Sequence, residues 1–276
     1  MKAISYSLFG YNRERSENCF DFNSYLRGLM LCIRFNRLIY PEWENVLNTD
    51  QSTYNGFEEL FKYLEERNIL KVQINKNGAL LCEAMLWRLK PIYDNYTHVL
   101  CRDLDSLSTY RERQAVEYWV NQDTKALHAI TDSVSHDIPL LGGMIGAKCE
   151  HFKTRTHTNY FNELMSLCNI NLSIKGSDQT FLNTILYPMF ADKGRDSITQ
   201  HYFNGYANTF LSDFHTCTCA PPMGHSYNCP NNYRTELPDE MKESNSVCGH
   251  IGASGYYETQ TFRFLRKYWN HFNDLI

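Results

Sequence analysis

The chain has 276 residues, of which 43% are hydrophobic, so it is long enough to bury one sizeable core or two closely joined lobes. Its 27 basic and 31 acidic residues give a net charge of −4, and this charge balance gives no indication of a nucleic-acid-binding protein. No apolar run approaches the roughly 20 residues that span a bilayer, and the opening MKAISYSLFG is too short and polar for a signal peptide. We therefore expect a soluble, intracellular protein.

Strands and helices alternate through the first hundred residues. The segments with the apolar and β-branched content of strands are 2–9, 44–48, 70–74 and 97–101. The segments with apolar side chains at helical spacing are 23–39, 56–67 and 80–90. Pro91 is expected to end the third helix. This alternation is typical of a parallel sheet covered by helices on both faces.

The alternation loosens after residue 110. We expect helices near 110–121, 160–168 and 178–187, and strands near 126–130 and in the glycine-rich LLGGMIGAK. Residues 204–255 are loop-like, with clustered Pro, Asn, Gly and Cys, and an amphipathic helix follows at about 257–272. The aromatic side chains of that helix could dock on the sheet or on a second subunit, and docking on the core is the commoner outcome.

Two carboxylates, Asp103 and Asp105, follow the strand at 97–101 in the sequence CRDLDS. In an extended segment residues i and i+2 share a side, so both can direct oxygens at one point while Leu104 enters the core. Parallel sheets bind ligands beyond the carboxyl ends of their strands, and such a pair suits Mg²⁺ or Mn²⁺ better than Zn²⁺. The alternative is a solvated turn with a helix cap at Asp105 or Ser106, the commoner explanation of an isolated D-x-D.

Three further features favour a site at this edge. The residues concerned are Arg88, Gly142, Gly143, Asp178 and Gln179. The arginine lies in the last turn of the helix before the D-x-D strand, and the glycines fall in a predicted strand, where Gly is unfavourable unless something approaches the backbone closely. The acid and amide begin a helix, with Ser177 or Asp178 as its cap. Each feature alone has an ordinary explanation, and their combination favours a ligand site.

With these segments in this order, the sequence resembles the GT-A glycosyltransferases, which move a sugar from a nucleotide diphosphate donor. MLWRLKPIYDNYTHVLCRDLDS looks like their donor-binding Arg, helix end, strand and D-x-D, and IPLLGGMIGAK resembles the strand whose glycines border the transferred sugar. DQTFLN is similar to a segment of the glycogenin and lipopolysaccharide galactosyltransferase group, and GHIGASG resembles their late His-x-x-Gly segment. The composite RDLDSLSTYRERQAVEYW with LLGGMIG looks more like a branch found in bacteria and large algal viruses, where it would serve glycan synthesis.

The resemblance, which spans residues 2–255, implies roles for single residues. Asp103, Asp105 and His250 would hold Mn²⁺ or Mg²⁺, which stabilises the departing diphosphate; Asp103 could instead contact the ribose and a metal-bound water. The donor and nucleotide contacts would come from Ser5, Tyr6, Ser7, Gly10, Asp50, Arg88, Arg102, Asp103, Gly142, Gly143, Gly249, Gly252 and Ala253. Tyr6 could stack on a uracil ring or be buried. A UDP-sugar is the favoured donor, with a pentose or a hexose.

The same resemblance makes Asp178 and Gln179 the catalytic residues. In an inverting enzyme Asp178 could be the base that deprotonates the acceptor hydroxyl. In a retaining enzyme Gln179 would lie against the anomeric carbon, and both outcomes stay open. The family's Lys after the late glycine has no counterpart in GASGYYETQ, so a diphosphate contact from that side is not predicted.

The implied fold is α/β of the GT-A, Rossmann-like type, with a mostly parallel central sheet flanked by helices and a loop-rich, Cys-containing C-terminal region. We expect one catalytic domain over 1–276: a nucleotide-binding half at 1–106, an acceptor-side half at 107–203, and a Cys-rich loop with the C-terminal helix at 204–276. The expected partners are a nucleotide-sugar donor, a glycan or glycoprotein acceptor and a candidate twin subunit, with no nucleic acid and no transmembrane segment. The expected location is the cytoplasm of a bacterium or of a virus-infected host cell.

Two other groups of side chains could bind metal. Four thiolates in the last quarter could close a structural Zn²⁺ site, with reduced thiols or a disulfide as alternatives, and their spacing matches no standard finger. They are Cys217, Cys219, Cys229 and Cys248. His128, Asp132 and His136 could form a second metal site, but Asp132 and His136 more commonly line the acceptor side or satisfy loop backbone groups. The six cysteines scattered in apolar patterns are predicted to be buried free thiols: Cys19, Cys32, Cys82, Cys101, Cys149 and Cys168.

Two other functions compete with the metal-dependent glycosyltransferase. A glycoside hydrolase also uses paired carboxylates, but it holds them about 5–9.5 Å apart across the scissile bond, which a D-x-D on one side of a strand serves poorly. A zinc-stabilised interaction module without catalysis would use the sheet as a scaffold only. The ordered motifs favour the glycosyltransferase.

Overall fold

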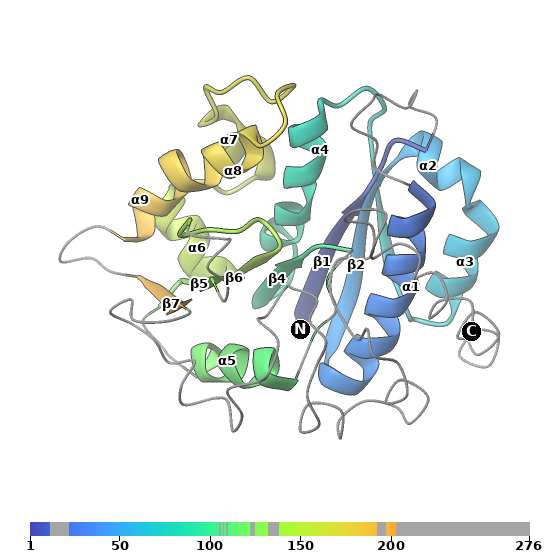
Figure 1. Cartoon of the computed structure of the whole chain (residues 1–276), viewed down its shortest axis with the longest axis horizontal. Helices are drawn as coiled ribbons and strands as arrows, with labels where there is room; N and C mark the ends of the chain where they lie inside the picture. The colour runs from blue at the N-terminus through green and yellow to red at the C-terminus, as the bar shows by residue number, and fades with distance from the viewer. Residues whose placement is uncertain are drawn as a thin grey trace, which may run out of the picture.

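A computed structural model of the chain describes residues 1–11, 22–104, 106, 108, 110–121, 125–131, 138–191 and 197–202. In this part of the chain, seven strands form one sheet in the order β3-β2-β1-β4-β6-β5-β7. The strands are β1 (Lys2–Leu8), β2 (Trp43–Asp50), β3 (Lys71–Asn75), β4 (His98–Arg102), β5 (Leu127–Thr131), β6 (Met144–Lys148) and β7 (Ile198–Tyr202). Figure 1 shows β1 and β2 near the centre of the molecule, with α1 running alongside β2.

The sheet is mostly parallel. β1 pairs in parallel with both β2 and β4, β2 with β3, and β5 with β7, whereas β6 runs antiparallel to β4 and β5. The carboxyl ends of β1, β2 and β4 therefore meet at one edge of the sheet, where parallel sheets bind their ligands. The predicted α/β class, with a mostly parallel sheet flanked by helices, is confirmed.

Helices cover both faces of the sheet. They are α1 (Phe22–Ile39), α2 (Gln51–Gly56), α3 (Glu58–Glu66), α4 (Leu81–Leu86), the 3-10 helix η1 (Trp87–Tyr93), α5 (Tyr110–Val120), α6 (Cys149–Thr156), α7 (Phe161–Ser166), α8 (Ser177–Phe181), the π-helix η2 (Leu182–Leu186) and α9 (Tyr187–Phe190). One buried cluster joins the sheet to α1, α3 and α5, and a second joins it to α4, η1 and α6 to α9. We call these the α1 face and the α4 face.

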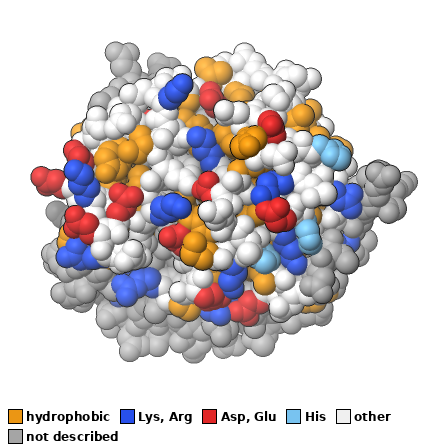
Figure 2. Space-filling model, turned by 180° about the vertical axis from the view of Figure 1, so that it is seen from behind, with side chains coloured by type: hydrophobic (Ala, Val, Ile, Leu, Met, Phe, Trp, Pro, Cys, Tyr) orange, Lys and Arg blue, Asp and Glu red, His pale blue; other side chains and the backbone are white. Residues whose placement is uncertain are grey.

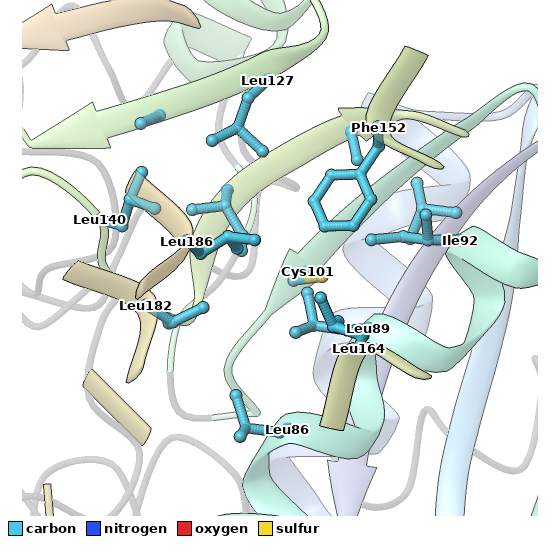
Figure 3. Close-up of a cluster of buried hydrophobic side chains, with 14 of the residues drawn as sticks. Leu86, Leu89, Ile92, Cys101, Leu127, Leu140, Phe152, Leu164, Leu182 and Leu186 are labelled. Carbon is cyan, nitrogen blue, oxygen red and sulfur yellow. The ribbon is translucent and has the colours of Figure 1, made fainter. Parts of the chain in front are cut away.

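Alternation along the strands decides which face each side chain enters. Ile4 and Tyr6 of β1 enter the α1 face, and Ala3 enters the α4 face. On the α4 face, Leu86 and Leu89 pack in the same cluster as Cys101 of β4 (Figure 3). Burying each leucine contributes about 1.5–3 kcal/mol, so this packing stabilises the position of the helical turn that contains both residues.

Local geometry differs from the sequence predictions at one proline and at two glycines. Pro91 does not end its helix but lies inside η1. The chain changes from α-helix to 3-10 helix at Trp87, before it reaches Pro91, which has no backbone N–H to donate. Gly142 and Gly143 form a turn that precedes β6 instead of lying within a strand. The sequence patterns also missed α2, α6 and β7, which are short and mix polar with apolar side chains.

The predicted thiols are found where the structure describes them. Cys32, Cys82, Cys101 and Cys149 are buried and free, and Cys168 is free and half-buried. Burial raises the pKa of both Cys101 and Cys149 to about 12, so these thiols stay protonated at neutral pH. Cys19 lies outside the described residues, as do the loop-like region at 204–255 and the helix at 257–272.

The described surface mixes charges of both signs. On the face opposite to that of Figure 1, acidic and basic side chains alternate without a broad patch of one sign (Figure 2). None of the helices in the described ranges is long and apolar enough to cross a membrane. The division of the chain into a nucleotide half and an acceptor half stays a prediction.

Candidate functional site

Arg88 lies at the centre of the candidate site. It is 5% exposed on η1, and its Nε donates to the Met85 carbonyl at 2.8 Å. Its Nη1 donates to Oδ1 of Asp103, and its Nη2 lies 4.0 Å from Oδ2 of Asp178. Burial alone would lower the pKa of Arg88, but the charges of Asp103 and Asp178 outweigh it and raise that pKa. Arg88 is therefore a fixed cation shared by two carboxylates.

Asp103 follows the end of β4 and faces both Arg88 and a glycine turn. Its side chain is 46% exposed, so the carboxylate keeps a solvent-facing side. A Cβ at Gly143 would lie 2.0 Å from Asp103 Oδ2, and one at Gly142 would lie 3.1 Å from the side-chain amide of Gln179 and 3.2 Å from Arg88 Nη2. The group that approaches the Gly143 backbone is thus the Asp103 carboxylate, and no larger residue fits there without moving it.

Asp178 is buried within the first turn of α8. It is 1% exposed, and neither carboxylate oxygen has a hydrogen-bond partner among the described residues. The predicted cap at Ser177 or Asp178 is wrong: the N-cap is Gly176, because Ser177 Oγ donates to the Ile174 carbonyl at 2.7 Å and Asp178 turns toward Arg88. An unpaired buried carboxylate is strongly unfavourable, so Asp178 depends on Arg88.

Gln179 and Asn183 hold the chain that leads to the glycine turn. In the amide orientation that satisfies both of its ends, Gln179 donates to the Leu140 carbonyl at 2.9 Å and accepts from Gly142 N at 3.0 Å. One turn later, Asn183 accepts from Leu140 N at 2.8 Å and donates to the Leu140 carbonyl at 2.9 Å. Asn183 is the last residue of DQTFLN and was given no role from sequence; its i, i+4 spacing from Gln179 is the signal that places both on one helix face.

Six of the predicted residues are therefore brought into contact from four separate segments: Arg88, Asp103, Gly142, Gly143, Asp178 and Gln179. Their chemical roles stay predictions. The arrangement offers a half-exposed carboxylate, a buried guanidinium, a small-residue turn and a half-buried amide within one region at the carboxyl edge of the sheet.

The ends of β1 and β2 are tied together by Asp50. Its Oδ2 accepts from Gly10 N at 2.7 Å, and its Oδ1 accepts from Thr53 N and Ser52 Oγ, both at 2.7 Å, so it caps α2. Burial alone would raise the pKa of Asp50, but these hydrogen bonds outweigh it and lower that pKa. Asp50 is a charged cap that shapes the loop after β1.

Tyr6 is not at the surface of this edge. It is 1% exposed on the α1 face, and its hydroxyl accepts from Asn36 Nδ2 at 2.7 Å. Ser5 is also fully buried, and Asn48 Nδ2 donates to its Oγ at 3.0 Å. Ser7 Oγ is buried without a hydrogen-bond partner among the described atoms. The exposed ring here is Tyr11, which is 44% exposed and was missed from sequence, although it directly follows the predicted Gly10.

Arg102 points away from Asp103. It is 2% exposed on the α1 face, and its Nε donates to Glu112 Oε1 of α5 at 2.8 Å. Its Nη1 donates to the carbonyls of Cys101 and Ile145 at 2.7 and 3.0 Å. Arg102 therefore neutralises a buried glutamate, and we leave it out of the predicted donor contacts.

The predicted metal ligands are described only in part. Within the described ranges, no three or more His, Cys, Asp or Glu side chains are grouped to hold a metal ion. Asp103 supplies a half-exposed carboxylate, a hard oxygen donor that fits Mg²⁺ or Mn²⁺. His128 is buried and stacks on Trp119 with ring centroids 5.1 Å apart, as a core histidine does. The predicted site residues outside the described ranges are Asp105, Asp132, His136, Cys217, Cys219, Cys229, Cys248, Gly249, His250, Gly252 and Ala253.

Comparisons with known proteins give only distant similarities. No protein-family model and no curated protein sequence match the chain. The glycosyltransferase GlyE of Streptococcus pneumoniae is 14% identical, covers 72% of this chain and 44% of its own, and has a TM-score of 0.45. A mannosyltransferase from Pyrobaculum calidifontis, solved with GDP-Man and Mn²⁺, is 14% identical, covers 56% of this chain and 46% of its own, and has a TM-score of 0.38.

A third solved structure is the 4-diphosphocytidyl-2C-methyl-D-erythritol synthase of Anaerococcus prevotii. It is 10% identical, covers 75% of this chain and 90% of its own, and has a TM-score of 0.40. The present chain spans less than half the length of the first two proteins. Similarity at these TM-scores assigns no function, so the functional argument rests on the residues of the site.

Proposed function

We propose that the chain is a glycosyltransferase that moves a sugar from a nucleotide diphosphate donor, with a UDP-sugar favoured, to a hydroxyl of a glycan or glycoprotein. The observation that carries the proposal is Arg88 joined to Asp103 and Asp178 beside the Gly142-Gly143 turn. The D-x-D, glycine and D-Q segments that resemble those of GT-A enzymes in the sequence supply these residues, at the edge where the parallel strands end.

The donor diphosphate would lie over the end of β4. Asp103, with Asp105 and His250, would hold Mn²⁺ or Mg²⁺, and this ion supplies Lewis-acid stabilisation of the departing diphosphate. Arg88 orients Asp103 through Oδ1 and leaves Oδ2 on the side of the glycine turn. Its own charge favours binding of an anionic donor through charge-assisted hydrogen bonds.

The reacting sugar would lie beside Gln179. Gln179 is half-buried and holds the Gly142 backbone, whereas Asp178 is 1% exposed behind Arg88. A general base must reach the proton that it removes, so the burial of Asp178 favours a role as the ion-pair partner of Arg88. This geometry supports the arrangement of a retaining transferase, with Gln179 against the anomeric carbon.

The nucleobase would stack on Tyr11 rather than on Tyr6. Tyr11 is 44% exposed a few residues beyond the end of β1, and the centroid of its ring lies 4.9 Å from that of Phe57, which packs against it. The backbone next to Tyr11 is fixed by the hydrogen bond from Gly10 N to Asp50. An exposed, braced aromatic ring is the usual platform for a base, and stacking contributes about 1–3 kcal/mol.

A glycoside hydrolase fits the same residues less well. A hydrolase needs one carboxyl group that is protonated and ready to donate its proton to the leaving group. Asp178 is 1% exposed behind Arg88 and so does not reach a leaving group, and Asp103 already accepts a hydrogen bond from the Arg88 guanidinium. Neither is therefore placed as the acid of a hydrolase.

The proposal is tested with a panel of UDP- and GDP-sugars, measured by thermal shift and by donor turnover, with and without Mn²⁺. We expect Mn²⁺-dependent stabilisation by one donor, and we expect Asp103→Asn to lower turnover by about 100-fold or more, as removal of one transition-state-stabilising group does. Asp94→Asn is the matched control, because Asp94 is a half-buried aspartate at the opposite end of η1, where it accepts from Gln73 of β3. Turnover that is unchanged in Asp103→Asn, or binding of no donor, would refute the proposal.

A further inference from the structure

One face of α1 lies against the chain that leaves β4. Gly28, Cys32 and Asn36 recur every four residues and so share a side of the helix, which we call the α1 stripe. The chain that leaves β4 through the D-x-D motif, described at residues 103, 104, 106 and 108, is called here the D-x-D turn. The α1 stripe contacts this turn from the α1 face, whereas Arg88 contacts Asp103 from the α4 face.

The first two residues of the stripe contact backbone carbonyls of the turn. A Cβ at Gly28 would lie 1.9 Å from the Leu104 carbonyl oxygen, so helix and turn touch backbone to backbone. Cys32 Sγ lies 3.5 Å from the Ser106 carbonyl oxygen and 3.9 Å from those of Asp103 and Leu104. Leu104 itself is 2% exposed in the core of the same face. A side chain at position 28, or one of another shape at position 32, must displace the turn.

The third residue of the stripe anchors the far end of the turn. Asn36 is 1% exposed, and its Oδ1 accepts from Ser108 Oγ at 2.9 Å. Its Nδ2 donates to the Tyr6 hydroxyl at 2.7 Å and to Asn45 Oδ1 at 2.6 Å. Both ends of the Asn36 amide are thus engaged, which sets its orientation and joins the turn to β1 and β2.

A buried ion pair links the residue before the turn to α5, the helix that follows the turn. Arg102, directly before Asp103, is paired with Glu112 of α5, and the two side chains are 2% and 1% exposed. Tyr40, just beyond α1, donates its hydroxyl to Glu112 Oε1 at 3.1 Å. Burial raises the pKa of Tyr40 well above its usual value, so it stays a hydrogen-bond donor. The described residues of the turn are therefore held from Arg102 at one end to Ser108 at the other.

We propose that the α1 stripe positions the D-x-D turn, so that Gly28, Cys32 and Asn36 are positioning residues for the Asp103 carboxylate. The consequence for catalysis rests on the proposed function. Because the turn touches α1 through its carbonyls, a shift of the Leu104 backbone moves Asp103 relative to Arg88 and Gly143. Misplacement of a reacting group by about 1 Å can lower a rate about 100-fold.

Hydrogen exchange of the unliganded full chain tests this positioning without any metal or turnover. We expect Gly28→Ala and Cys32→Ala to accelerate exchange of the peptide over 102–109 by about tenfold or more, and Cys32→Ser to recover part of the protection. Cys82→Ala is the matched control, since Cys82 is a fully buried thiol whose Sγ lies 3.1 Å from the Ile174 carbonyl oxygen on the α4 face. The inference is overturned if that peptide exchanges as in the wild type, or if Cys82→Ala accelerates it equally.

Equilibrium binding of UDP in the presence of Mn²⁺ supplies the second readout. We expect the dissociation constant to rise about tenfold or more in Gly28→Ala and Cys32→Ala, and to be unchanged in Cys82→Ala. If the wild type itself binds no UDP with Mn²⁺, the proposed function fails, while the exchange experiment still decides whether α1 holds the turn. If Gly28→Ala does not fold, the comparison of Cys32→Ala with Cys82→Ala decides it.

Discussion

Replacing Arg88 with Met should leave a carboxylate unpaired inside the protein. Asp178 is 1% exposed, and both of its oxygens lack hydrogen-bond partners within the described part of the chain. The cation that faces it is Arg88, with Nη2 4.0 Å from Oδ2. Met is also long and unbranched, so it can fill much of the space of the Arg88 stem, and the loss is mainly electrostatic.

The magnitude follows from these distances and exposures. Two unit charges 4 Å apart interact by about 4 kcal/mol at an effective dielectric constant near 20. Asp103 adds about 1 kcal/mol or less, since its side chain is 46% exposed and water solvates it once Arg88 is gone. The lost hydrogen bond to the Met85 carbonyl adds about 1 kcal/mol. These contributions sum to about 5–6 kcal/mol in a rigid structure. Relaxation around the site lowers this value, so we expect Arg88→Met to lower the free energy of unfolding by about 3–5 kcal/mol, the usual range for breaking a buried pair.

Urea unfolding followed by circular dichroism measures this loss, and a double-mutant cycle assigns it to the pair. Asp178→Asn removes the stranded charge, so the double variant should recover about 2–3 kcal/mol relative to the sum of the single changes. Arg113→Met is the control, because Arg113 pairs with Glu117, whose side chain is 51% exposed, and an exposed pair contributes about 1 kcal/mol or less. A loss below about 1 kcal/mol in Arg88→Met, or additivity in the cycle, would falsify the dependence of Asp178 on Arg88.

The remaining predictions concern separate parts of the molecule. Gly143→Ala should lower donor turnover by about 100-fold, and more than Gly142→Ala does, because its Cβ would meet Asp103 Oδ2 at 2.0 Å; equal kinetics for the two variants would contradict the geometry. Asn183→Leu should destabilise the fold by about 1–3 kcal/mol by leaving the Leu140 N–H without its side-chain acceptor, whereas Thr184→Val, at an exposed neighbour, should be close to neutral in urea unfolding. Tyr11→Ala should raise the dissociation constant of UDP about tenfold in calorimetry, and an unchanged constant would exclude Tyr11 as the base platform. Burial lowers the pKa of His98 from 6.5 to about 4, so the folded protein binds fewer protons than the unfolded chain in that window and loses stability as the pH falls through it. After a discount for the exposed part of the ring, this loss is about 1–2 kcal/mol; melting temperatures of His98→Gln that fall as steeply as those of the wild type between pH 6.5 and 4 would exclude His98 as its source.

Spacing along the sequence was enough to predict the sheet. Strands and helices that bury a continuous face are recognised by the periodicity of their apolar residues, as β1 and α1 are. Arg88, Asp103 and Asp178 were grouped for another reason, the order of their segments, which resembles that of the GT-A glycosyltransferases. The physics that predicts the strands and helices is local, whereas a contact between distant segments is not encoded in spacing.

Orientation within an element was the part that spacing did not settle. Arg102 and Asp103 are neighbours, but strand alternation directs them to opposite faces, one toward Glu112 and the other toward Arg88. The same rule separates Tyr6 from Ser5 and Ser7, which the sequence reading had combined in one pocket. Gly176 as the α8 cap, and Pro91 within η1, depend on tertiary packing around α4 and α8, which propensities do not encode.

The unequal exposure of the two carboxylates determines which of them can leave Arg88 when a donor binds. Asp103 is 46% exposed, so exchanging the guanidinium for a cation in solution requires little further desolvation. Asp178 is 1% exposed, so water does not reach it to solvate its charge in place of Arg88. Under the proposed function, Arg88 therefore stays paired with Asp178 while Asp103 would bind the metal. The α1 stripe determines the position of the Asp103 carboxylate before the donor binds. Placement of the guanidinium depends on the α4 face and placement of the carboxylate on the α1 face, so the site depends on both helical layers being docked on the same sheet.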